Sequence, residues 1–222
     1  MSDDPSDHGL AVVEPPFEAD GADGADGIAG VVLAAGTSER FGAENKLLAT
    51  VEGEAIVRRS VRTLLAAGLD PIVVVVGHEA DAVGAAVSDL PVSTVENDAY
   101  ESGQASSVRA GIDALEGNGR PEAEAEAAVV ALGDMPFVDP GTVESLVSAY
   151  RSGVADALAA ATDGVRGNPV LFDRRFFEEL TAIDGDTGGR SVLLEGPSAA
   201  LVDVEDRGVR RDVDVRSDLD AA

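Results

Sequence analysis

Short apolar runs alternate with amphipathic segments from residue 28 onward, and this alternation constrains the fold more than any other feature of the chain. The run at 71–76 contains Ile-Val-Val-Val-Val, which is typical of a strand buried on both faces of a sheet. The segment at 54–67 instead repeats apolar residues every three or four positions, as a helix with one buried face does. Strands that alternate with helices predict a mostly parallel sheet with right-handed crossovers. We therefore expect an α/β fold, a three-layer αβα arrangement with a Rossmann-like sheet.

The same patterns predict the remaining elements. The predicted strands are 28–34, 71–76, 92–95, 127–132, 155–161, 169–172, 199–202 and 209–213. The predicted helices are 54–67, 79–87, 106–115, a segment that begins at Asp139-Pro140, 174–180 and 187–194. Ligands of such sheets bind outside the carboxyl ends of the strands. Polar loops follow the strands that end at 34, 76 and 132, so we expect these three loops to converge on one edge.

The domain organisation follows from composition. Residues 1–26 are rich in Asp, Gly, Ala and Pro, which predicts a disordered acidic tail, and residues 27–222 are expected to form a single domain. The chain has 222 residues and is 45% hydrophobic, enough for one sizeable core. No apolar run approaches the roughly 18 residues of a membrane span. The N-terminus opens with acids and lacks a basic, apolar leader, so a cytoplasmic location is expected.

The charge balance is extreme, with 42 acidic against 16 basic residues and a net charge of −26. Such a surface repels nucleic acid and anionic lipid, and neither is expected as a partner. A folded chain this acidic indicates a halophilic cytoplasm, where the Debye length falls to about 3 Å near 1 M salt. The absence of Cys excludes disulfides, zinc–thiolate sites and a thiol nucleophile. Lys46 is the one lysine, which suggests that a compact ammonium is needed there.

The stretch from Leu33 to Lys46 has the composition of a phosphate-binding loop. Small residues at its start let a ligand approach the backbone, and free N–H groups of a Gly/Thr/Ser loop bind phosphate oxygens. Arg40 and Lys46 add cations for a triphosphate. No Gly-Lys-Ser/Thr follows, so the loop is not a P-loop, and an ordinary βα turn with surface bases is the alternative. The nucleotide-binding residues predicted here are Leu33, Ala34, Ala35, Gly36, Thr37 and Ser38.

Two further polar segments follow strands. Asp134 comes directly after the strand at 127–132, and Mg²⁺ takes one or two carboxylates together with phosphate oxygens. The alternative is a turn aspartate that caps the next segment. The loop before residue 106 leads into a helix, whose N-terminus binds an anion or a base edge, and Ser106 is also a candidate N-cap. The nucleotide-binding residues predicted in this second loop are Gly103, Gln104, Ser106 and Ser107.

The pattern Leu-Ala-Ala-Gly-x-Ser-x-Arg-Phe-Gly-x-x-x-Lys at 33–46 resembles the signature of the molybdenum cofactor cytidylyltransferases and guanylyltransferases. The resemblance continues in order through 97–111, 133–136, 167–172, 185–190 and 212–219. It implies the fold of the nucleotide-diphospho-sugar transferases, a Mg²⁺ cofactor, and transfer of a nucleoside monophosphate from an NTP to the phosphate of molybdenum cofactor, with release of pyrophosphate. The cytidylyl branch is closer, because Ala35 stands where guanylyl members usually have Gly.

The resemblance also assigns roles. Arg40 and Lys46 would act on the β- and γ-phosphates, and Asp134 would hold the metal. Asp214 matches a second metal carboxylate, in an Asp-x-x-x-Asp-Leu pattern. The residues implied for the acceptor are Asn168 and Arg190, although Arg190 pairing with surface acids is the alternative. A molybdoenzyme or cofactor-insertion protein is the implied protein partner. Guanylyl transfer, a sugar- or polyol-phosphate nucleotidyltransferase and a non-catalytic nucleotide-binding regulator remain open.

Overall fold

The computed structural model describes residues 9–17, 24–38, 40–42, 44–117, 125–185 and 188–219. These residues form an eight-stranded sheet in the order β1-β10-β8-β9-β7-β2-β5-β6. Its strands are β1 Ala11–Val13, β2 Ile28–Ala34, β5 Ile72–Val76, β6 Ser93–Glu96, β7 Ala127–Leu132, β8 Ala157–Thr162, β9 Val165–Asp173 and β10 Ala199–Asp203. Strand β9 is antiparallel to both β7 and β8, and the other neighbouring pairs are parallel. The expected mostly parallel sheet is confirmed.

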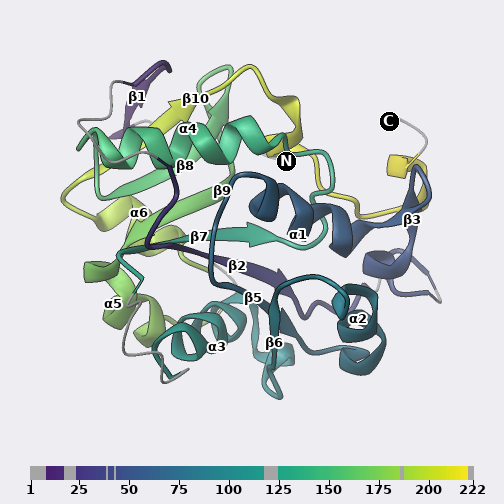
Figure 1. Ribbon diagram of the computed structural model, residues 1–222. Helices are drawn as coiled ribbons and strands as arrows, with labels where there is room; N and C mark the ends of the chain where they lie inside the picture. The colour runs from purple at the N-terminus through teal and green to yellow at the C-terminus, as the bar shows by residue number, and fades with distance from the viewer. Residues whose placement is uncertain are drawn as a thin grey trace.

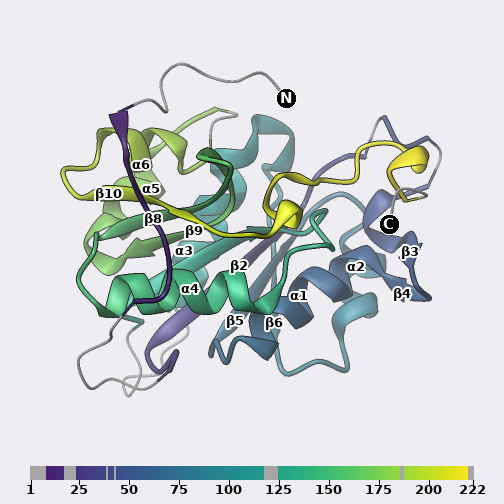
Figure 2. The ribbon, with the colours of Figure 1, turned by 90° about the horizontal axis from the view of Figure 1, so that it is seen from above.

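Helices cover both faces of the sheet (Figures 1 and 2). Helices α1 Ile56–Ala66, α2 Ala80–Val87 and α4 Pro140–Arg151 lie on one face, and α3 Gln104–Gly117, α5 Phe177–Ala182 and α6 Arg190–Glu195 lie on the other. Alternate valines of β5 explain the two cores: Val74 packs toward α1 and α2, whereas Val73 and Val75 pack toward α3. The three-layer αβα architecture is therefore confirmed. None of the helices in the described ranges is long and apolar enough to span a membrane.

The strand order creates a crevice beside β2. The chain runs outward from β2 to β5 and β6 and then returns to β7 on the other side of β2. Leu33 and Leu132 are register partners at the carboxyl ends of these two strands, and Gly133 N–H donates to the Leu33 carbonyl at 2.8 Å. Loops that leave neighbouring strands in opposite directions open a ligand-binding crevice between them. The loops after β2 and β7 therefore meet at one edge, as expected. The loop after β5 joins them, since His78 N–H donates to the Ala35 carbonyl at 3.2 Å.

Part of the predicted tail is ordered, and the prediction is wrong there. Ala11–Val13 form β1, which pairs in parallel with β10 and extends the sheet by one edge strand. Phe17 and Ala25 also pack against the core. The acidic composition of the segment hides this short apolar run, which is stabilised by the free edge of β10. Residues 1–8 and 18–23 of the predicted tail lie outside the described residues.

The predicted strand at 209–213 is also wrong. Residues Arg207–Arg210 form a 3-10 helix, and Val209 and Val213 are buried outside the sheet. The Val209 carbonyl crosses β9 so closely that a Cβ on Gly167 would lie 2.1 Å from it. The apolar pattern at 209–213 therefore arises because Val209 and Val213 anchor a segment that crosses β9, and not because the segment is a strand. The predicted helix start at 187 lies outside the described residues, and α6 begins at Arg190.

Two hairpins account for further differences in the element boundaries. Thr50–Val51 (β3) and Glu54–Ala55 (β4) pair antiparallel, so α1 begins two residues later than predicted. Both residues between these strands, Glu52 and Gly53, have positive φ, as a tight hairpin turn requires. Asp163-Gly164 makes the same kind of turn between β8 and β9. This turn makes β9 antiparallel, which the lengths of the apolar runs did not indicate.

The close packing of α3 on the sheet generates a stability prediction. A Cβ on Gly111 would lie 2.4 Å from Val31 Cγ1, so we expect Gly111→Ala to reduce the free energy of unfolding by about 1–3 kcal/mol. Gly84 in α2 has open space at the same position, and Gly84→Ala is the matched control, with an expected gain of about 0.5–1 kcal/mol. Denaturant unfolding at one fixed salt concentration measures both. Equal effects of the two substitutions would contradict this account of the packing.

Candidate active site

A cavity of about 680 Å³ opens at the crevice between β2 and β7. Its walls come from the loop after β2, the start of α3, the turn after β7 and the C-terminal segment. The lining residues are Leu33, Ala35, Gly36, Thr37, Ser38, Arg40, Lys46, Leu47, Tyr100, Glu101, Gly103, Gln104, Ser107, Leu132, Asp134 and Asp214. The structure thus brings together most of the residues that the sequence singled out for the nucleotide and the metal.

Ala34 and Ser106 do not line the cavity. Ala34 alternates to the opposite face of β2 and is buried, and its Cβ would lie 3.2 Å from a Cβ on Gly133. The Ser106 hydroxyl donates to the carbonyls of Ala99 and Gly103 at 3.0 and 2.8 Å. The prediction that Ser106 is the N-cap is wrong, because α3 begins at Gln104 and the Ser106 hydroxyl accepts from Asn97 Nδ2 rather than from an N–H of the helix. Ala34 is therefore kept out of the cavity by close packing, and Ser106 by its hydrogen bonds to neighbouring residues.

The loop after β2 is shaped by its own side chains. Ser38 has a positive φ of 58°, and its hydroxyl donates to Asn45 Oδ1 at 3.3 Å. The same hydroxyl accepts from Lys46 N–H at 3.3 Å, while Asn45 Oδ1 also accepts from Leu47 N–H at 3.0 Å. These bonds cap the 3-10 helix Lys46–Leu48. The position of Lys46 is therefore fixed by the polar residues of the loop that precedes it.

The Lys46 ammonium joins two carboxylates that are far apart in the sequence. Nζ lies 2.7 Å from Asp134 Oδ2 and 3.1 Å from Asp214 Oδ1. The Arg40 guanidinium, which is largely exposed, contacts the other oxygen of Asp214 at 2.8 Å. Only 13% of the Lys46 side chain is exposed, so solvent screens the ammonium less than it screens Arg40. The four side chains form one connected charge cluster at the mouth of the crevice.

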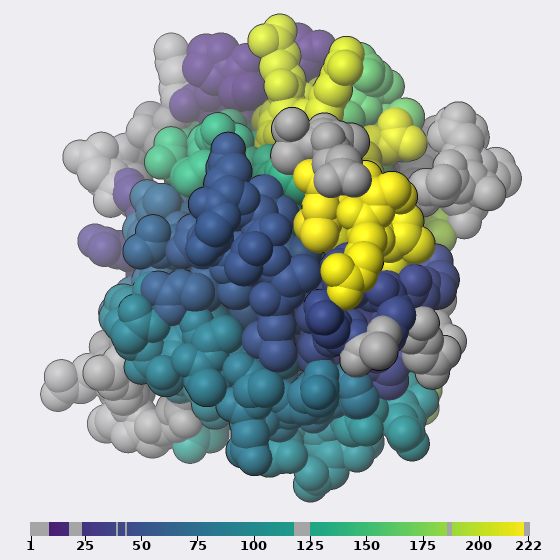
Figure 3. All heavy atoms as spheres, turned by 90° about the vertical axis from the view of Figure 1, so that its right-hand side faces the viewer, coloured from purple at the N-terminus to yellow at the C-terminus, as the bar shows by residue number. Residues whose placement is uncertain are grey.

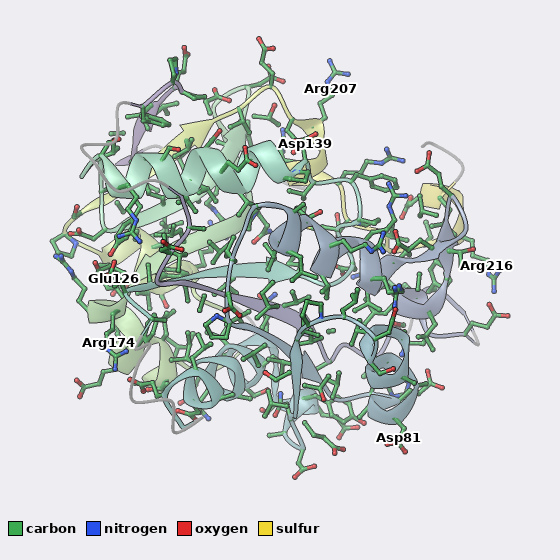
Figure 4. The ribbon with its side chains drawn as sticks, viewed as in Figure 1. Asp81, Glu126, Asp139, Arg174, Arg207 and Arg216 are labelled. Atoms are coloured by element: carbon green, nitrogen blue, oxygen red, sulfur yellow. The ribbon has the colours of Figure 1, made fainter. Side chains whose placement is uncertain are left out.

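The C-terminal segment brings Asp214 to this cluster. Buried Val213 donates its N–H to the Asp134 carbonyl at 2.9 Å, and the N–H groups of Asp214 and Val215 both donate to Asp218 Oδ2 at 2.9 Å. Arg216 contacts Glu44 at 2.7 Å. In Figure 3 the segment, in yellow, lies against the blue first third of the chain. Figure 4 shows Arg216 at the opposite end of the molecule from Glu126, which directly precedes β7. The segment therefore closes the edge where the strands end.

Burial and charge act together on the cluster. Burial by itself would lower the pKa of the Lys46 ammonium, but the Asp134 and Asp214 carboxylates overcome this effect and raise that pKa above its usual value. Burial raises the pKa of the Asp134 carboxyl, and the nearby ammonium opposes the rise. The ammonium is therefore held charged, which favours a role in binding anions.

The donor set at Asp134 fits a divalent cation. Asp134 Oδ1 is buried and has no hydrogen-bond partner, so one hard oxygen remains available for a ligand. Asp214 supplies a second carboxylate that lines the same cavity. Within the described ranges, no group of three or more Asp, Glu, His or Cys residues is placed to hold a metal ion. A metal at this site would therefore take its remaining ligands from substrate oxygens or water.

Several lining residues were not predicted, namely Leu47, Tyr100, Glu101 and Leu132. Tyr100 and Glu101 belong to a 3-10 helix, Tyr100–Ser102, that precedes α3. A Cβ on Gly77 would lie 2.8 Å from the Cβ atoms of Ala35 and Tyr100. Gly77, directly after β5, is the sequence signal that could have indicated Tyr100, because a glycine there allows the segments of Ala35 and Tyr100 to approach each other closely.

A second cavity of about 300 Å³ adjoins the first. Both residues implied for the acceptor, Asn168 and Arg190, line it. The other lining residues are Leu33, Gln104, Val108, Val130, Leu132, Arg166, Val170, Phe172, Gly189 and Leu193. Apolar side chains alternate in this wall with the polar groups of Gln104, Arg166, Asn168 and Arg190, a mixture that suits a polar small molecule. The two cavities share part of their lining, so ligands in them would be neighbours.

The fold and the charged cavity define a nucleotide-binding α/β enzyme. Residues 30–200 match the MobA-like NTP transferase domain family. The chain belongs to this family and is a nucleotidyltransferase by membership. The predicted resemblance is thereby confirmed at the level of the family.

Similar proteins cover most of the chain. It is 31% identical to nicotine blue oxidoreductase of Paenarthrobacter nicotinovorans, over 83% of this chain and 91% of that protein. It is 31% identical to purine catabolism protein PucB of Bacillus subtilis (strain 168), over 86% and 93%. The crystal structure of Rv0371c from Mycobacterium tuberculosis H37Rv superimposes with a TM-score of 0.75 at 28% identity, over 89% and 97%. A complex of Rv0371c with manganese superimposes with a TM-score of 0.69 at 27% identity, over 87% of this chain and 96% of that chain.

The single lysine makes the charge cluster directly testable. Isotope labelling of lysine gives one side-chain NMR signal, and we expect its titration midpoint to lie above the usual lysine value because two carboxylates hold the proton. Asp134→Asn removes one of these charges and should lower the midpoint. Asp113→Asn, at an exposed position of α3, should leave it unchanged. A wild-type midpoint at or below the usual value would contradict the described cluster.

Proposed function

We propose that this nucleotidyltransferase moves CMP from CTP to the phosphate of molybdenum cofactor, with Mg²⁺ and with release of pyrophosphate. The observation that supports it best is the cluster of Lys46, Asp134, Asp214 and Arg40 at the mouth of the nucleotide cavity. The cluster combines groups for phosphate oxygens with groups for a divalent cation. Asn168 and Arg190 in the adjoining cavity supply a place for a second, phosphorylated substrate.

Charge balance is the argument for the metal. The charged residues that line the cavity are two cations, Arg40 and Lys46, and three carboxylates, Glu101, Asp134 and Asp214. An anionic triphosphate would enter this cavity in a protein of net charge −26. A divalent cation held by Asp134 and Asp214 would bridge protein and phosphate oxygens, neutralise charge and polarise the phosphoryl group. The manganese complex of Rv0371c supports a divalent ion in a related fold.

The reaction needs no general base from the protein. An oxygen of the acceptor's phosphate attacks the α-phosphorus of the NTP in line, a new P–O bond forms, and the bond to the β-phosphate oxygen breaks. The attacking phosphate monoester is already largely ionised at neutral pH, since its second pKa is about 6. Lys46 and Arg40 bind the β- and γ-phosphates and stabilise the negative charge that gathers on the departing pyrophosphate. The protein acts by positioning and charge.

The preference for a pyrimidine rests on Ala35. Its side chain lines the cavity and is buried against the space above Gly77, where no further atom fits. A glycine at this position, as in the guanylyl branch, would leave more room at the cavity wall. The methyl group therefore favours the smaller cytosine over guanine.

The name of the Paenarthrobacter relative suggests a second candidate, an oxidoreductase. The two candidates differ in what they consume, because nucleotidyl transfer releases pyrophosphate from an NTP, whereas a redox reaction changes the absorbance of a nicotinamide or dye substrate. The paired cations and carboxylates of the cavity suit a metal-bound triphosphate and favour the transferase. Sugar or polyol phosphates remain alternative acceptors, which a substrate screen separates.

The central experiment is a pyrophosphate-release screen of four NTPs against molybdenum cofactor and common sugar phosphates, at fixed high salt. We expect CTP with molybdenum cofactor to give the highest kcat/KM. Ala35→Gly should narrow the preference for CTP over GTP by removing the methyl group from the cavity wall. A higher wild-type kcat/KM with GTP would replace the cytidylyl assignment by the guanylyl one. Turnover of nicotinamide without release of pyrophosphate would support the redox candidate.

Asp134→Ala tests the carboxylate that fits the metal. We expect kcat to fall at least about 100-fold, because a metal-held charge in the transition state is lost, while the far-UV circular dichroism spectrum is unchanged. Asp113→Ala removes an exposed carboxylate of α3 and is the matched control, with activity near that of the wild type. Activity of Asp134→Ala within a few-fold of the wild type would remove this residue from the mechanism.

A further inference from the structure

Three described residues line both cavities, namely Leu33, Leu132 and Gln104. Leu33 and Leu132 are apolar register partners at the ends of β2 and β7 and form a shared floor. Gln104 is the polar residue of this group. Its side chain is half-buried, and within the described ranges its carboxamide has no hydrogen-bond partner. An amide with free donors therefore stands where the two substrates of the proposed reaction would meet.

The start of α3 is held rigidly on two sides. Asn97, buried after β6, donates from Nδ2 to the hydroxyls of Ser106 and Ser107 at 2.8 and 3.0 Å. On the other side, Ala105 N–H donates to the Gly185 carbonyl at 3.0 Å. Gln104 is the first residue of the helix and directly precedes the three residues that make these attachments. Its backbone is therefore fixed relative to both cavities.

The turn before α6 is shaped around the Gln104 side chain. Gly188 is buried with a φ of +52°, and a Cβ there would lie 2.6 Å from Gln104 Oε1. Next to it, a Cβ on Gly189 would lie 2.8 Å from Phe172 Cζ, under the second cavity. The paired glycines therefore leave room for the carboxamide at the junction. Any side chain at 188 would push the amide away from its place.

We propose that Gln104 orients the two substrates by donating hydrogen bonds to the α-phosphate of the nucleotide and to the attacking phosphate of the acceptor. The inference rests on the proposed function and deepens it. A carboxamide has two N–H donors on one nitrogen, so it reaches two phosphate oxygens at once. It adds no charge, so it aligns two anions while leaving charge stabilisation to Lys46 and Arg40. Alignment of reacting groups is a large part of catalysis of this type.

Gln104→Ala should lower kcat about 10-fold, the effect of one neutral hydrogen bond in the transition state, and raise KM for both substrates. Two comparison variants separate the cavities, because Ser107 lines only the first and Asn168 only the second. Ser107→Ala should raise KM for the NTP alone, and Asn168→Ala should raise KM for the acceptor alone. Gln104→Glu places a negative charge between two phosphates and should be worse than Gln104→Ala. A Gln104→Ala profile that changes only the NTP's KM would overturn the proposal.

A double-mutant cycle with Gly188 gives a readout that a merely structural glutamine would not produce. Gly188→Ala should lower kcat in the wild type, because the new Cβ displaces the amide. In a Gln104→Ala background the same change should have little further effect on kcat. The backbone strain that alanine introduces at a φ of +52° is present in both backgrounds, so it does not account for a difference between them. Additive effects on kcat would contradict the proposal.

The cycle is run with the NTP and acceptor that the wild type uses best, so a failed inference leaves wild-type transfer intact. If the wild type releases no pyrophosphate with any combination of NTP and acceptor, the proposed function fails. Gln104 is then tested by calorimetric binding of CTP with Mg²⁺ and of inorganic phosphate, each alone. The proposal expects Gln104→Ala to weaken both ligands, and unchanged binding of either would overturn it.

Discussion

The structure of the site depends on one ion-pair cluster, in which the Lys46 ammonium joins Asp134 and Asp214. These residues belong to the loop after β2, the turn after β7 and the C-terminal segment, and their contacts hold the three segments together. A weakly exposed ammonium between two carboxylates is costly to separate, because each charge would be left desolvated without a partner. Backbone contacts on both sides hold this cluster in place. Ser38 and Asn45 accept hydrogen bonds from the backbone at Lys46 and Leu47, and Val213, next to Asp214, donates its N–H to the Asp134 carbonyl.

The same cluster explains how an acidic protein can accept an acidic substrate. The surface repels anions in general, so affinity for a triphosphate has to come from local cations and a bound metal ion. The two carboxylates near Lys46 keep the ammonium charged but also cancel its field when no substrate is present. A metal at Asp134 and Asp214 would release the lysine and Arg40 to the phosphates. Nucleotide binding and metal binding are then expected to be coupled.

The two cavities adjoin each other but draw on different parts of the sheet. The first cavity lies at the ends of the parallel strands β2 and β7, while residues of β9 and α6 line the second cavity. Strand β9 is antiparallel, and its residues Arg166, Asn168 and Val170 line the second cavity. Residues of β2, β7 and α3 also line this second cavity, so β9 and α6 supply only part of its wall. The start of α3, with Gln104, connects the two cavities.

The sequence by itself determined the layered fold and the nucleotide loop, because apolar periodicity and loop composition are local properties of the chain. The bounds of β2 and β7 were predicted to the residue, and the loops at their ends were expected to meet. Only the tertiary structure decided that 11–13 form an edge strand, that 209–213 cross β9 outside the sheet, and that Ala34 and Ser106 face away from the cavity. It also decided that Gln104 lies at the junction of two cavities. Each of these depends on contacts between segments far apart in the chain, which local patterns do not record.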